Sequence, residues 1–118
     1  MTSKKKHNET AIIKAAKFNL LDAVSYQDNA IVSREMASKD AGTVTIFAFA
    51  KGQGLSEHKA PFDALVYVFD GEVEIHISGK PHFLKAGEMI IMPANKPHAV
   101  KALGKFKMLL IMIRSYIR

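Results

Sequence analysis

Short runs in which hydrophobic and polar residues alternate dominate the chain from residue 30 onward, and this pattern predicts β-strands. The clearest run is 72–78 (EVEIHIS), where apolar residues occupy the odd positions and polar or charged residues the even ones. Such a strand has one buried face and one face toward solvent. The runs that we expect to form strands are 30–37, 43–50, 65–69, 72–78, 82–85, 88–92, 99–103 and 106–113.

Turn-forming residues separate these runs. The stretches 39–42 (KDAG) and 78–80 (SGK) are typical of tight turns, and Asp70-Gly71 between two apolar runs predicts a hairpin. Gly104 predicts a turn between the last two strands. Many short strands with turns at intervals of roughly 8–12 residues are typical of an all-β sandwich or barrel.

Two of the expected strands do not alternate. The runs 43–50 (TVTIFAFA) and 106–113 (FKMLLIMI) are almost continuously apolar, so both faces of each strand should be covered. A second copy of the chain would cover the run 106–113, which predicts a homodimer. The alternative is a central strand beneath a folded-over N-terminal arm.

The N-terminal part of the chain has a different character. Residues 1–10 (MTSKKKHNET) are expected to be a disordered basic tail, and 11–118 a single domain. The run 11–17 (AIIKAAK) has the composition of a helix but is short for an independent one. Asn19 is a good N-cap for a single helical turn over 20–24.

Composition narrows the function classes. Hydrophobic residues make up 48% and charged residues 24% of the 118 residues, as in soluble globular proteins. No apolar run approaches the roughly 20 residues of a membrane span, and no signal-like segment follows the basic start, so a cytoplasmic protein without membrane contact is expected. The absence of cysteine excludes disulfides and thiolate ligands.

The net charge of +6 does not indicate nucleic-acid binding. Lys4, Lys5 and Lys6 contribute three of these charges within the tail. No basic stripe interleaved with aromatic residues and no known nucleic-acid-binding motif accompanies them. We therefore expect no nucleic-acid partner.

Two glycine-led blocks, GQGLSEHKAPFDALVYVFDG at 52–71 and GEMIIMPANKPHAVKA at 87–102, resemble the two motifs of the cupin superfamily. The resemblance is to small single-domain cupins of the conserved-barrel, RmlC-like type, and it implies a double-stranded β-helix, the jelly-roll barrel. It covers most of the chain, and cupins of this size are commonly dimers. The positions that match the two motifs are Gly52, His58, Gly71, Gly87, Pro93 and His98.

Four positions depart from the family pattern. Ala60 stands in the slot of the second histidine and Ala64 in that of the glutamate, so half of the usual four metal ligands are missing. Ala102 replaces the final asparagine. Asn95 replaces a glycine of positive φ, a conformation that asparagine tolerates better than other residues, so this change is expected to be structural.

The resemblance places His58 and His98 on neighbouring strands at the barrel mouth. Two converging imidazoles suit one divalent transition metal, namely zinc, nickel, iron, manganese or copper. Asp63 could be a third ligand if a bulge turned it inward. The alternative is a metal-free polar pocket in which the two histidines form hydrogen bonds.

The rest of the expected pocket is apolar and roomy, because two ligand slots have shrunk to alanine. The six methionines are expected to be barrel packing, His76 a surface residue, and the direction of His82 ambiguous. The residues expected to line the ligand site are Gln53, Ala60, Ala64, Val66 and Val100.

Two functions fit these features. One is a small-molecule-binding or sensing protein that holds its ligand at the histidine pair. The other is a metal-dependent enzyme resembling the cupin dioxygenases, isomerases or decarboxylases. A third, weaker reading is an accessory subunit that acts through its dimer surface. No nucleophile elbow, phosphate-binding loop or thiol adds another catalytic site.

Overall fold

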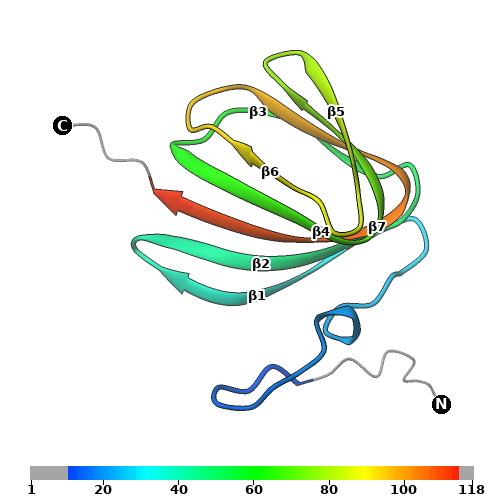
Figure 1. Cartoon of the computed structure of the whole chain (residues 1–118), viewed down its shortest axis with the longest axis vertical. Helices are drawn as coiled ribbons and strands as arrows, with labels where there is room; N and C mark the ends of the chain where they lie inside the picture. The colour runs from blue at the N-terminus through cyan, green and yellow to red at the C-terminus, as the bar shows by residue number, and fades with distance from the viewer. Residues whose placement is uncertain (1–10, 115–118) are drawn as a thin grey trace.

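The computed structural model describes residues 11–114 and contains one short 3-10 turn followed by seven strands (Figure 1). Within this range no helix has the length and apolar composition needed to cross a bilayer. The elements are η1 (Leu20–Asp22), β1 (Ile31–Lys39), β2 (Gly42–Phe49), β3 (Gly54–His58), β4 (Phe62–Ile77), β5 (Lys80–Lys85), β6 (Met89–Met92) and β7 (His98–Arg114).

The two longest strands build the fold. β4 and β7 pair with each other along most of their length. On its other side, each of these strands pairs with a different strand in its first and second half. The first half of β4 pairs with β6 and its second half with β5. The first half of β7 pairs with β3 and its second half with β2. The seven strands form one continuous antiparallel sheet that bends into two layers, β1-β2-β7-β4-β6 and β3-β7-β4-β5, called its two sheets below. The predicted all-β jelly-roll barrel is therefore confirmed.

The predicted hairpin at Asp70-Gly71 is wrong, because β4 continues through these residues and passes from one sheet into the other. Bulges between Val68 and Asp70 and between Gly71 and Val73 bend the strand there. Gly71 has φ +75°, and a Cβ at this position would clash with the carbonyl oxygen of Lys105 on β7. The local turn signal therefore marks a bend at which two backbones touch.

The predicted turn at Gly104 is wrong for the same reason. The runs 99–103 and 106–113 are a single strand, β7, whose pairing with β4 continues on both sides of the glycine. The alternation pattern did not predict β3, because residues 54–58 (GLSEH) carry no apolar alternation; only the resemblance placed His58 on a strand. Its pairing with β7 makes it a strand.

The two faces of β2 belong to two different hydrophobic clusters. Phe47 and Phe49 face the main core between the sheets, whereas Ile46 and Ala48 pack beneath the N-terminal segment. The coverage expected for the apolar run 43–50 therefore comes from within the chain. Leu109 of β7 also lies under this segment, so the folded-over arm covers part of the run 106–113.

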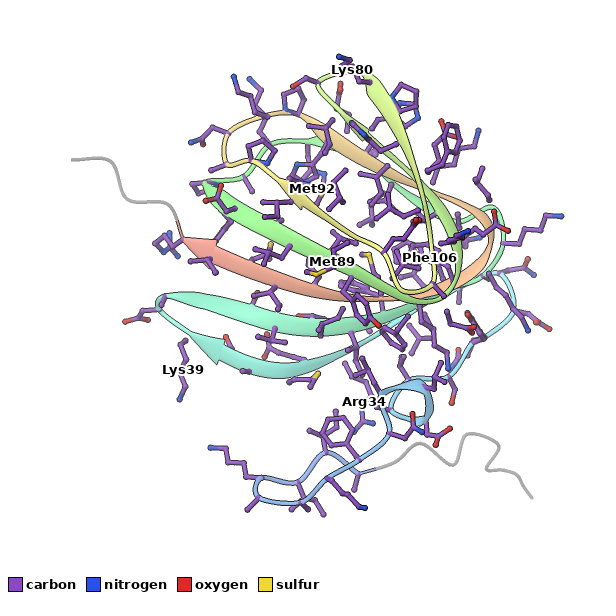
Figure 2. All side chains as sticks on the ribbon, in the orientation of Figure 1. Arg34, Lys39, Lys80, Met89, Met92 and Phe106 are labelled. Carbon is purple, nitrogen blue, oxygen red and sulfur yellow. The ribbon has the colours of Figure 1, made fainter. Side chains whose placement is uncertain are left out.

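Polar contacts hold the N-terminal segment on the barrel. Arg34, labelled on β1 in Figure 2, donates a 2.7 Å hydrogen bond to the carbonyl of Ala23. The Lys107 ammonium, almost fully buried, donates at 2.6 Å to the carbonyl of Leu21. Asn19 caps η1 as predicted, since its side-chain oxygen accepts from the amide of Leu21 at 3.0 Å.

Residues 11–17 form no helix; the structure shows a turn around residues 14–16. Seven residues cannot sustain a helix without packing on one face, and Lys14 to Lys17 are all exposed. The prediction of a disordered tail falls on residues 1–10, which lie outside the described range.

Candidate functional site

His58 and His98 meet at one end of the barrel. His58 ends β3, His98 begins β7, and the two residues are paired in the antiparallel register. Their ring centroids lie 4.4 Å apart with an interplanar angle of 68°. His98 is buried, with 6% of its surface exposed, whereas His58 is exposed. One ring of the pair thus lies in the barrel interior and the other at its surface.

The backbone orients both rings in the same way. Nδ1 of His58 lies 2.9 Å from the carbonyl oxygen of Ser56, and Nδ1 of His98 lies 3.2 Å from that of Lys96. A carbonyl oxygen only accepts hydrogen bonds, so Nδ1 carries the proton in each contact. In the neutral ring Nε2 is then the unprotonated nitrogen. Histidines that bind metals are commonly held by this type of bond to a carbonyl.

The surroundings of His98 favour its neutral form. Burial lowers the pKa of its imidazole, and the adjacent His58 lowers it further. The hydrogen bond to the Lys96 carbonyl acts in the opposite direction and offsets part of this pKa shift. At neutral pH His98 therefore presents a lone pair toward its surroundings, with no positive charge.

A cavity of about 40 Å³ adjoins the two rings. A buried water needs about 10–15 Å³ on this measure, so the cavity holds at most about three waters or a single ion. Organic ligands occupy sites of several hundred Å³. The cavity is lined by Leu55, His58, Ala64, Met92, His98, Val100, Met108, Leu110 and Met112.

The expectation of a roomy pocket is therefore wrong, although the apolar lining is confirmed. Ala64 does leave space where the family pattern has a longer side chain. The residues paired with Ala64 on its two sides are Met92 of β6 and Met112 of β7. Long, flexible methionine side chains fill irregular gaps efficiently, so they occupy most of this space.

The residues predicted to line the ligand site divide into two groups. Ala64 and Val100 line the cavity, and Val66 lies in the core beside it. Ala60 lies in the loop before β4, where its carbonyl accepts from the amide of Asn95 at 2.8 Å. Gln53 contacts Ala102 through its backbone, four residues along β7 from His98. Neither Ala60 nor Gln53 is part of the cavity lining.

Asp63 does not join the two histidines. No bulge interrupts β4 at this point, so Asp63 and Ala64 face opposite sides of the sheet. One carboxylate oxygen of Asp63 accepts a 2.9 Å hydrogen bond from the amide of Ala94. Between residues 11 and 114 no three histidine, aspartate or glutamate side chains gather as a metal-binding group. The predicted third ligand is thus a contact that supports the loop before His98.

The same loop confirms the prediction for Asn95. Its φ is +64°, the left-handed conformation expected of a glycine replacement. The predicted surface position of His76 is also consistent with the structure, because its Nε2 contacts Glu74 on the outer face of β4. The methionines of the cavity were predicted only as packing. The strand pairing, which the sequence does not show, connects Met92 and Met112 to the site through Ala64.

Comparison with known proteins identifies similar chains. The family model described as a cupin domain matches residues 45–114. A conserved Streptococcus pyogenes protein of unknown function is 30% identical over 93% of this chain and 97% of its own, with a TM-score of 0.84. A cupin superfamily protein from Desulfitobacterium hafniense is 26% identical over 92% of this chain and 99% of its own, with a TM-score of 0.83.

A further similar structure is longer. The cupin 2 conserved barrel domain protein from Leptotrichia buccalis is 48% identical over 82% of this chain, with a TM-score of 0.80. The match covers 47% of that protein, so the present chain spans about half its length. A search of the curated proteins found no match.

Proposed function

The chain belongs to the cupin family, and on that premise we propose that it is a binding protein that holds a very small ligand at His58 and His98. The observation that carries this proposal is the paired geometry of the rings, 4.4 Å apart and each tied through Nδ1 to a carbonyl. Both Nε2 atoms are thereby available for one ligand.

The chemistry of the pair restricts that ligand. Two unprotonated nitrogens attract a metal cation or the N–H and O–H donors of a small molecule. The adjoining cavity of about 40 Å³ limits the part of the ligand that enters the barrel to one ion or a group the size of about three waters. Any larger portion of a ligand must remain outside, on the exposed side of His58.

The residues present do not fit the divalent metal of the four-ligand family site. Ala60 and Ala64 supply no donor atom, and Asp63 is engaged with the Ala94 amide. Divalent transition ions in stable protein sites usually have three or four protein ligands. Binding is therefore better supported than metal-dependent catalysis.

The test is recovery of the natural ligand. Tag-free protein should be purified and analysed by native mass spectrometry and elemental analysis, beside a His58→Ala/His98→Ala double variant. We expect a bound species that is lost from the double variant. A His76→Ala variant removes a histidine on the outer face of β4 and is the matched control. Equal ligand content in all three proteins would overturn the proposal.

A further inference from the structure

Three methionines line the cavity beside the histidine pair. Met92, Met108 and Met112 all line it together with His58 and His98. Met92 and Met108 are 3% and 1% exposed, and Met112 is partly buried. The cavity thus brings histidine side chains from one sheet and methionine side chains from the other to one small space.

The strand register explains why these sulfurs gather there. Ala64 is paired with Met92 on β6 and with Met112 on β7. Directly paired residues on neighbouring strands have side chains on the same face of a sheet, so both methionines flank the short alanine side chain. The position that carries a glutamate in the family pattern is therefore bordered by two thioethers. Figure 2 labels Met92, and on the same strand Met89, which points to the opposite face.

The donor set is soft and uncharged. The cavity lining contains no carboxylate, so nothing in it neutralises a second positive charge. The cost of removing an ion from water rises steeply with its charge, which favours a monovalent cation over a divalent one in such a site. Thioether ligands select copper(I), and imidazole also binds copper well.

We propose that this cavity is a copper(I) site whose ligands are the Nε2 atoms of His58 and His98 and the sulfurs of Met92 and Met112, with Met108 beside them. The inference rests on the proposed function, because it uses the same imidazole pair. It adds the identity of the ligand and the role of the methionines. The site differs from the divalent family site in both donor type and charge.

The test is a copper(I) titration of the tag-free full chain under anaerobic, reducing conditions, in competition with the chromophoric chelator bicinchoninate. A His7→Ala background removes the imidazole of the tail. We expect one equivalent of copper(I) to bind, and a copper X-ray absorption spectrum with both nitrogen and sulfur scattering. A Met92→Leu/Met112→Leu variant keeps the apolar volume but removes both sulfurs. Its affinity for copper(I) should fall at least about tenfold, the scale on which metal sites respond to loss of supporting groups.

Two methionines outside the cavity serve as matched controls. Met89→Leu changes the outward-facing methionine of the same strand, and Met36→Leu changes one beneath the N-terminal segment. Both should bind copper(I) like the parent protein. Thermal unfolding of each variant shows that the fold is intact.

The outcomes separate this inference from the proposed function. Copper(I) binding that is lost in His58→Ala/His98→Ala but unchanged in Met92→Leu/Met112→Leu overturns the sulfur ligands and leaves the histidine site standing. Absence of copper(I) binding by the folded parent chain overturns the copper site alone, since recovery of another ligand still supports the proposed function. Copper(I) binding that neither variant changes overturns the site itself.

Discussion

At the scale of single residues, hydrogen bonds to the backbone determine the orientation of the polar side chains near the site. His58 and His98 are aimed by carbonyls two residues earlier in the chain, and Asn95 holds the left-handed turn that precedes His98. Asp63 accepts from the Ala94 amide in the same loop. The Asp63 carboxylate thus supports a loop, whereas the two imidazoles lie beside each other at the end of the barrel.

The role of Asp63 can be tested by Asp63→Ala. Loss of the hydrogen bond to the Ala94 amide should lower the free energy of unfolding by about 1 kcal/mol, the usual contribution of such a bond. Ligand binding at the histidine pair should be unchanged. Urea denaturation and the copper(I) titration give the two quantities. A large loss of affinity with little loss of stability would show that Asp63 is a ligand after all.

At the scale of the elements, two long strands that bend between sheets replace the hairpins expected from local sequence. β4 changes sheets at Asp70-Gly71, and β7 crosses from one sheet to the other around Gly104. The N-terminal segment is the third structural unit, because it covers Ile46, Ala48 and Leu109. Tyr26 joins this segment to the bend, since its hydroxyl donates a 2.7 Å hydrogen bond to Asp70.

The bend of β4 depends on a glycine at position 71. Gly71→Ala places a methyl group against the Lys105 carbonyl and also strains a positive φ. Gly79→Ala is the matched control, because its φ is similar, +80°, and nothing lies within 4 Å of the added carbon. We expect the control to lose about 1–2 kcal/mol of stability from backbone strain alone. Gly71→Ala should lose about 3 kcal/mol or more, in the range of severe steric changes. Equal losses, measured by chemical denaturation, would contradict the close contact of β4 and β7.

The contact between Tyr26 and Asp70 predicts a pH dependence at high pH. Burial raises the pKa of the Tyr26 hydroxyl, and its hydrogen bond to the Asp70 carboxylate raises it further. Below about pH 10, the ordinary tyrosine pKa, the hydroxyl is protonated in both the folded and the unfolded chain. Above it only the unfolded chain ionises, so the stabilising contribution is lost as the pH rises.

Tyr26→Phe should remove this component of the alkaline destabilisation. The measurement is the free energy of unfolding between pH 8 and pH 11 for the parent and the variant, with Tyr67→Phe as the control. Tyr67 lies on the outer face of β4, and within residues 11–114 its hydroxyl forms no hydrogen bond to a carboxylate like that of Tyr26. Parallel pH curves for the parent protein and Tyr26→Phe would contradict the prediction.

At the scale of the whole molecule, one sheet face is only partly covered. On the outer face of β1-β2-β7-β4-β6, Ile91 pairs across the strands with Leu65, which pairs with Ile111. Met89, Ile91 and Ile113 are 53%, 60% and 51% exposed. The N-terminal segment covers only the part of this face around Ile46 and Leu109. Contiguous exposed apolar patches usually mark contact sites. We therefore propose that a second copy of the chain covers the exposed part of this sheet face.

The homodimer predicts a specific sensitivity to charge. Ile91→Lys should convert the dimer to a monomer in sedimentation velocity experiments, because a buried unpaired ammonium at the centre of the patch is costly. Phe83→Lys alters a residue that is even more exposed, at 66%, but lies on β5 of the other sheet. This control should remain dimeric. A parent protein that sediments as a monomer at all concentrations rules out the dimer.

The sequence by itself determined the strand character, the jelly-roll class, the positive φ of Asn95 and the meeting of His58 with His98. The strand character follows from local alternation and the φ of Asn95 from conformational preference. The jelly-roll class and the meeting of the two histidines are what the resemblance of two motifs to the cupin pattern implied. Tertiary structure alone decided that β4 and β7 continue through their glycines, because long-range pairing outweighs a local turn preference. It also decided the content of the pocket: whether the space beside Ala64 is open or filled depends on the strands paired with it, and those strands bring Met92 and Met112.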